Sequence, residues 1–117
     1  MVLFIEYPKC STCQKAKAWL DKNKIEYIDR HIKENNPSYD ELKEWHSRSG
    51  YELKKFFNTS GLLYKSLGLK DKLIAMSDDE KLAMLSSDGM LVKRPLIIAD
   101  DFVLVGFKET EWENKLK

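Results

Sequence analysis

The sequence has few of the residues that cross-link, break or kink a chain: its 117 residues include two cysteines, three prolines and five glycines. Two cysteines are too few for a disulfide framework, so we expect a hydrophobic core to hold the fold together. No apolar run approaches the roughly 20 residues that span a bilayer. The N-terminal run Val2–Tyr7 lacks the basic segment and cleavage site of a secretory signal. We therefore expect a cytoplasmic protein without membrane contact, in a compartment that keeps thiols reduced.

An excess of charge of one sign is also missing. The chain carries 20 basic and 19 acidic residues, a net charge of +1, and interleaves them without a basic block. Direct binding to nucleic acid is not expected, because it usually needs a basic patch. A hydrophobic content of 43% and this length are typical of one globular domain, residues 1–117.

The first part of the chain predicts a strand–helix–strand unit. The apolar run Val2–Tyr7 indicates a buried strand. Ser11 and Thr12 offer N-cap hydroxyls to a helix whose apolar residues recur at helical spacing as far as Asn23. A second strand is predicted at Ile25–Ile28. Short links between these elements indicate a βαβ unit with parallel strands.

The rest of the chain is predicted to be helical first and then to form strands. Capping-box patterns, Ser38 with Glu41 and Ser77 with Glu80, open two helices. The other predicted elements are short helices at Glu52–Phe57 and Leu63–Leu67, strands at Leu96–Ala99 and Phe102–Val105 joined by Asp100 and Asp101, and a closing helix around Trp112 and Leu116. The order predicts an α/β, thioredoxin-like fold, with residues 35–92 as a mainly helical insertion between an N-terminal βαβ and a C-terminal ββα unit.

Cys10 and Cys13 are the first candidate site residues, because they lie where the first strand passes into the first helix. Free backbone N–H groups and the positive end of the helix dipole favour a thiolate at Cys10. Cys13 lies about one helical turn further on, so its sulfur can reach that of Cys10. This arrangement predicts a redox pair in which Cys10 attacks and Cys13 resolves the mixed disulfide.

Two other interpretations of the cysteines remain open. A zinc site needs two more ligands, and His31 and His46 lie fifteen positions apart, outside the usual spacing of paired histidine ligands. Both cysteines could also be buried simply as small hydrophobic side chains. We expect no metal and no other cofactor.

Arg94, which precedes Pro95, is the third candidate site residue. Its planar guanidinium could stabilise a thiolate, a sulfenate or an oxyanion. The alternative is that Lys93 and Arg94 form a solvated basic pair at the start of a strand. Arginines are scarce in this chain, with only Arg30, Arg48 and Arg94 available.

Five segments, in order, resemble the arsenate reductase (ArsC)-like family, which includes the Spx and MgsR-type proteins. They are Tyr7-Pro8-Lys9-Cys10-Ser11-Thr12-Cys13-Gln14-Lys15-Ala16, Asn58-Thr59-Ser60-Gly61, Leu67-Gly68-Leu69, Arg94-Pro95-Leu96-Ile97 and Val105-Gly106-Phe107. The resemblance covers nearly the whole chain. It implies a thioredoxin-like core with a helical insertion, and a cis peptide bond before Pro95 that faces the cysteines.

The resemblance implies a thiol-disulfide oxidoreductase related to arsenate reductases, with a glutaredoxin or thioredoxin-type protein as reductant. In the glutaredoxin-coupled reductases three arginines surround the oxyanion. Arg94 matches one of them, whereas the turn Asn58–Gly61 and the strand Phe102–Val105 carry none. The alternative is an Spx-like redox-sensing transcriptional regulator that binds the C-terminal domain of the RNA polymerase α-subunit. Gly50 lies near the glycine with which those regulators contact the polymerase.

Overall fold

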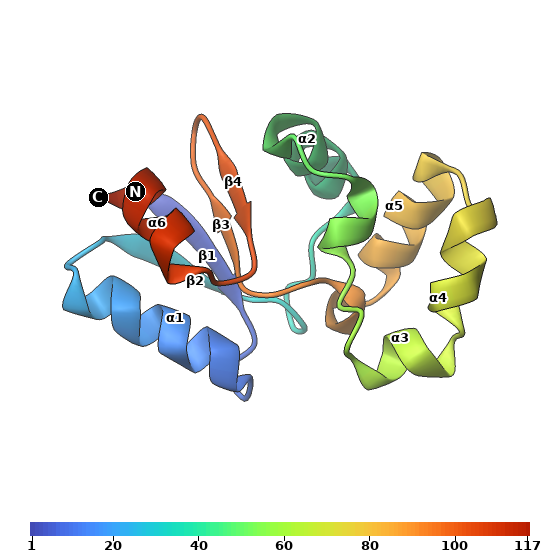
Figure 1. Ribbon diagram of the computed structural model, residues 1–117, viewed down its shortest axis with the longest axis horizontal. Coiled ribbons are helices and arrows are strands. Elements are labelled where there is room, and N and C mark those ends of the chain that lie inside the picture. The colour runs from blue at the N-terminus through green and yellow to red at the C-terminus, as the bar shows by residue number, and fades with distance from the viewer.

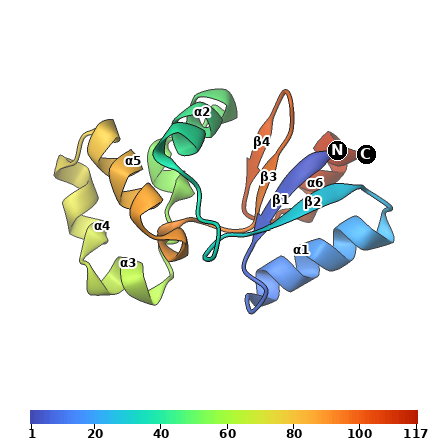
Figure 2. The same ribbon diagram turned by 180° about the vertical axis from the view of Figure 1, so that it is seen from behind.

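A four-stranded sheet organises the chain, and the computed structural model describes all of its residues, 1–117 (Figures 1 and 2). The strand order is β2 (Tyr27–His31), β1 (Val2–Glu6), β3 (Leu96–Ile98) and β4 (Val103–Val105). β1 and β2 run parallel and are joined by helix α1 (Ser11–Lys22). β3 pairs antiparallel with β1 and with β4. The predicted α/β, thioredoxin-like fold is confirmed.

The second strand begins later than predicted. It spans Tyr27–His31, whereas the sequence pattern predicted Ile25–Ile28. The reason is the way in which α1 ends: Lys24 adopts a left-handed conformation with φ of 57°, and the Ile25 N–H donates to the Leu20 carbonyl at 3.0 Å. Ile25 therefore belongs to the turn after α1, although its side chain is apolar.

Between β2 and β3 the chain is mainly helical. Its elements, where η denotes a 3-10 helix, are α2 (Tyr39–Ser49), η1 (Leu53–Phe56), α3 (Leu62–Ser66), α4 (Leu69–Lys72), η2 (Leu73–Ala75), α5 (Asp78–Ser87) and η3 (Gly89–Leu91). The sequence pattern did not predict α4 and η2. No helix of the chain combines the length and the apolar character needed to cross a membrane. The assignment of residues 35–92 as an insertion within one domain stays a prediction.

Both predicted capping boxes are confirmed. The Ser38 hydroxyl accepts a hydrogen bond from the Glu41 N–H at 3.1 Å, and the Ser77 hydroxyl accepts one from the Glu80 N–H at 3.2 Å. α2 ends at Gly50, which has a φ of 74°, a left-handed conformation in which a side chain would be strained. This gives Gly50 a structural reason to be glycine, independent of any partner.

The two faces of the sheet bury two hydrophobic cores, because successive side chains of a strand point to opposite faces. Phe4 and Ile97 pack on one face with α1 and with Trp112 of α6 (Glu109–Leu116), in a cluster of seven buried residues. Ile5 and Leu96 belong to a cluster of eighteen that includes residues of α2, α4 and α5. The helices between β2 and β3 therefore supply much of the larger core.

Three contacts fix this helical segment against the sheet. A Cβ at Gly89 would lie 1.8 Å from the Ile32 carbonyl oxygen, so the two backbones approach more closely than any side chain permits. Arg48 Nη1 of α2 donates to the Ala99 carbonyl oxygen, at the β3–β4 turn, at 2.5 Å. The Tyr51 hydroxyl donates to Glu111 Oε2 of α6 at 3.3 Å. The helical segment thus contacts the chain after β2, the β3–β4 turn and α6.

Candidate active site

Cys10 is the N-cap residue of α1. Its backbone is extended, with φ of −83° and ψ of 123°, and its carbonyl accepts the first helical hydrogen bond, from Gln14 N–H at 3.0 Å. The prediction that Ser11 or Thr12 caps the helix is wrong, because both already lie within it and no side chain caps it. The tight turn after β1, in which the Cys10 N–H donates to the Tyr7 carbonyl at 2.9 Å, sets this position. A sulfur therefore occupies the place that a capping oxygen usually takes.

Several groups around Cys10 favour its thiolate. Partial burial by itself would raise the pKa of the Cys10 thiol. Hydrogen bonds from the backbone N–H and the thiol of Cys13, another from the Thr12 N–H, and the positive charge of Arg94 outweigh that burial and lower the pKa below its ordinary value. Cys10 is also partly exposed, so an incoming molecule can reach a sulfur that ionises readily.

Cys13 has the opposite character. It is fully buried, and burial raises the pKa of its thiol to about 12, helped by its hydrogen bond and charge interaction with Cys10. The Tyr7 N–H and Arg94 oppose this rise only in part. Both cysteines are free thiols in this structure. The pair thus consists of one ionisable, accessible sulfur and one protonated, shielded sulfur in hydrogen-bond contact.

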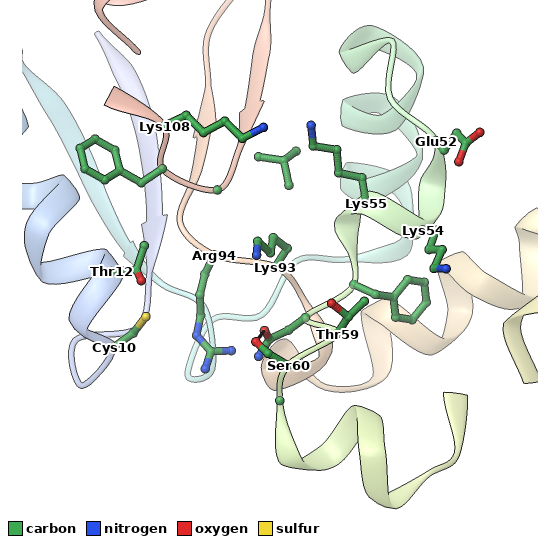
Figure 3. A pocket seen from close by; sticks show the side chains of 16 residues that line it. Cys10, Thr12, Glu52, Lys54, Lys55, Thr59, Ser60, Lys93, Arg94 and Lys108 are labelled. Carbon is green, nitrogen blue, oxygen red and sulfur yellow. Dashed lines mark hydrogen bonds between the residues drawn. The ribbon is translucent and has the colours of Figure 1, made fainter. Parts of the chain in front are cut away.

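Arg94 lies beside Cys10, where the chain enters β3 (Figure 3). The peptide bond between Arg94 and Pro95 is cis, as the family resemblance implies. The guanidinium lies 5.2 Å from the centre of the Tyr7 ring, and its Nη1 donates to the Met90 carbonyl at 3.4 Å. Its Nε is buried without a hydrogen-bond partner. Arg94 is therefore oriented by neighbours that leave its positive charge unneutralised.

Cys10 and Arg94 line a cleft of about 670 Å³ between the sheet end and the helical segment (Figure 3). Besides Arg94, the basic residues that line it are Lys54, Lys55, Lys93 and Lys108, and the only acidic one is Glu52. None of these side chains forms an ion pair. Five positive charges against one negative give the lining a net charge of +4, in a chain whose net charge is +1. The cleft is therefore strongly suited to anions.

Lys54, Lys55 and Lys108 were not predicted as anion-binding residues, because only arginines were considered for that role. Lys54 and Lys55 lie shortly before the segment Asn58–Gly61, and Lys108 follows the strand that ends at Val105. These are the two regions in which further arginines were sought. The sequence feature that could have identified these lysines is their position close to segments that resemble family motifs.

A buried acid near the cysteines was also missed. Glu6, at the end of β1, is 3% exposed, and its Oε2 lies 3.7 Å from Lys17 Nζ, which also contacts Asp29 at 2.9 Å. Burial and the neighbouring Asp29 carboxyl raise the pKa of Glu6 to about 7, although Lys17 acts against the rise. Lys17 lies one helical turn beyond Cys13, so this acid is beneath the same helix. The sequence feature that could have identified it is that Glu6 is the single acidic residue in the apolar run Val2–Tyr7.

The two histidines lie outside the cleft. His31 Nδ1 accepts hydrogen bonds from the backbone N–H groups of Lys33 and Glu34, and the His46 ring packs against Phe56. No three side chains among histidine, cysteine, aspartate and glutamate lie together in a way that could bind a metal ion. Structural roles account for both histidines.

The environment of Cys10 leads to a prediction about its reactivity. We expect iodoacetamide to alkylate Cys10 at pH 6.5 faster than a free cysteine, whose thiol titrates near 8.5. In R94Q, loss of the nearby positive charge should raise the pKa of the Cys10 thiol and so lower the thiolate fraction at this pH. Peptide mass spectrometry over a pH series measures the rate, and K22Q, at an exposed lysine outside the cleft, is the control. A wild-type rate equal to that of free cysteine would contradict the prediction.

Glu6 leads to a prediction about stability and pH. Because the folded protein keeps the Glu6 proton up to a pH of about 7 and the unfolded chain releases it near 4.5, stability falls as the pH rises between these values. This shift corresponds to roughly 3 kcal/mol at most. We expect E6Q, which stays neutral, to gain stability relative to wild type between pH 5 and pH 8 (about 3 kcal/mol at most). Urea unfolding measures the gain, and E26Q, at an exposed glutamate, should show none.

Comparison with known sequences assigns nearly the whole chain to one family. The ArsC family matches residues 5–115. YusI, an uncharacterized protein of Bacillus subtilis, is 54% identical over 111 residues, which cover 95% of this chain and 94% of YusI. The regulatory protein MgsR of the same organism is 29% identical over 108 residues, 92% of this chain and 84% of MgsR. Transcriptional regulators named Spx are 25–28% identical.

Solved structures agree with this assignment. An ArsC family related protein of Bacteroides fragilis superposes with a TM-score of 0.97 and 57% identity, over 99% of this chain and 97% of the other. An arsenate reductase of Vibrio cholerae superposes with a TM-score of 0.84 and 26% identity, over 99% and 97%. The predicted resemblance is confirmed: this chain belongs to the ArsC family.

Proposed function

We propose that the protein is a thiol-disulfide oxidoreductase of the arsenate reductase-like kind. The observation that carries the proposal is the asymmetry between the two sulfurs: Cys10 is accessible with a lowered pKa, and Cys13 is buried with a raised pKa. A nucleophile must be ionised and reachable, whereas a resolving thiol must stay protonated until the mixed disulfide forms beside it. The cleft's positive charge supports an anionic substrate.

The proposed reaction proceeds in two exchange steps. The Cys10 thiolate attacks one sulfur of a disulfide; a bond to Cys10 forms, the substrate's S–S bond breaks, and one thiolate leaves and takes a proton from water. Cys13 then attacks the Cys10 sulfur, which closes the Cys10–Cys13 bond, and its proton passes to the second departing thiolate. The substrate gains two electrons and the protein loses two. A dithiol protein of the glutaredoxin or thioredoxin type returns them, which suits a cytoplasmic location.

Arg94 has an electrostatic role in this scheme. Its guanidinium lowers the pKa of the Cys10 thiol and faces the negative charge that develops on the departing thiolate. Its partner-free Nε and its place in the cleft lining support this role. The likeness to the Vibrio cholerae arsenate reductase supports thiol-dependent reduction as the class of reaction.

The order of the two steps can be tested with C13S. After reaction with an aromatic disulfide, C13S should retain a mixed disulfide at Cys10, because no second thiol can release it. Wild-type protein should end with an internal disulfide and no adduct, and C10S should form no adduct. Intact-protein mass spectrometry separates the three products. Equal amounts of stable adduct in wild type and C13S would show that Cys13 does not resolve.

A redox-sensing regulator that binds RNA polymerase is the second candidate. The observation in its favour is the similarity to MgsR and to the Spx regulators over more than nine-tenths of the chain. A pull-down with the C-terminal domain of the polymerase α-subunit, using oxidised and reduced protein, tests it. Binding that depends on the state of the Cys10–Cys13 pair would support this function. Absence of binding in both states would remove it.

A further inference from the structure

The cleft is larger and more widely charged than a small ion beside Cys10 requires. Its volume of about 670 Å³ lies within the range of pockets that enclose whole drug-sized ligands. Its cations come from three separate parts of the chain: Lys54 and Lys55 from η1, Lys93 and Arg94 from the entry to β3, and Lys108 from the start of α6. Of these cations, Arg94 is the one whose charge lowers the pKa of the Cys10 thiol.

Two of the lysines form a separate positive end of the cleft. In Figure 3 the side chains of Lys55 and Lys108 extend toward each other at the end away from Cys10 and Arg94. Lys55 Nζ lies 4.0 Å from the centre of the Tyr51 ring, which positions this amine without neutralising its charge. Neither lysine pairs with a carboxylate. Two unpaired amines facing one space favour an anion between them.

The cleft lining also contains apolar side chains. Phe57, Val105 and Phe107 line the cleft together with the lysines and Cys10. Phe57 and Val105 are almost fully buried, so they form a rigid floor rather than mobile side chains. The lining therefore offers a ligand a thiol beside one guanidinium, apolar side chains, and a second cationic pair away from the sulfur.

We propose that the substrate is a disulfide that carries an anionic group remote from its sulfur, and that Lys55 and Lys108 bind that group while the sulfur meets Cys10. The inference rests on the proposed oxidoreductase function and names its class of substrate. Carboxylates of a peptide disulfide and phosphates of a nucleotide-linked disulfide share the required chemistry. A tetrahedral oxyanion would use only the Cys10 end of the cleft.

The test compares four disulfides with reduced, full-length protein. Glutathione disulfide carries carboxylates, coenzyme A disulfide carries phosphates, bis(2-hydroxyethyl) disulfide is neutral and cystamine is cationic. The rate of thiol loss with each is divided by the rate of the same disulfide with dithiothreitol, which removes differences in intrinsic reactivity. We expect at least one anionic disulfide to exceed cystamine by about tenfold or more at low salt, and the preference to shrink at about 0.5 M salt.

Matched variants then locate the effect. K55Q/K108Q should lower the ratio of the anionic to the neutral rate by about tenfold. K22Q/K43Q removes the same charge from exposed lysines outside the cleft and should leave this ratio as in wild type. Equal normalised rates for all four disulfides, or an equal fall in both double variants, would overturn the inference while the oxidoreductase function stands.

The two hypotheses fail in different ways. If no disulfide oxidises the reduced protein faster than it oxidises free cysteine, the proposed function is overturned. Binding of glutathione disulfide and of coenzyme A disulfide to C10S, measured by calorimetry, then tests the cleft without chemistry. Binding of either that is lost in C10S/K55Q/K108Q supports the cationic pair as its site. Binding that is unchanged in that variant, or binding of neither disulfide, overturns this assignment.

Discussion

The thiol chemistry proposed for this protein depends on the position of Cys10 at the start of α1. β1 ends in a turn so tight that the cysteine becomes the helix N-cap, where its sulfur lies beside the free N–H groups of the first helical turn. Without that placement, partial burial would raise the pKa of the Cys10 thiol and leave it inert. The sheet brings Arg94, at the entry to β3, beside this sulfur, and α1 buries Cys13 next to it.

Features that depend on neighbouring residues could be predicted from the sequence. The cysteine pair at a strand-to-helix passage, the capping boxes at Ser38 and Ser77 and the hairpin of β3 and β4 each lie within a few residues. The predicted N-cap of α1 was wrong because the turn after Tyr7 places Cys10, and not Ser11 or Thr12, at the N-cap position. The predicted start of β2 was wrong because Lys24 adopts a left-handed conformation, which the apolar side chain of Ile25 gave no reason to expect.

The cleft could not be predicted in the same way. Its lining joins Cys10 with residues near positions 55, 94 and 108, and only the folded sheet brings these segments together. Because basic and acidic residues are interleaved along the chain, the sequence does not indicate which lysines line the cleft. The raised pKa of Glu6 could not be predicted for a related reason: it depends first on burial and then on Asp29, which belongs to the neighbouring strand. The cysteine motif and the fold therefore do not by themselves reveal which side chains line the cleft.

The complete burial of Cys13 has a consequence for how this protein can be observed. A thiol with no accessible surface and a pKa of about 12 is invisible to electrophiles as long as α1 stays packed against β1. A thiol reagent should therefore modify one cysteine per molecule in the folded protein, and two when α1 has separated from β1. The number of reactive sulfurs per molecule therefore reports local unfolding of α1 at the site of the proposed thiol chemistry.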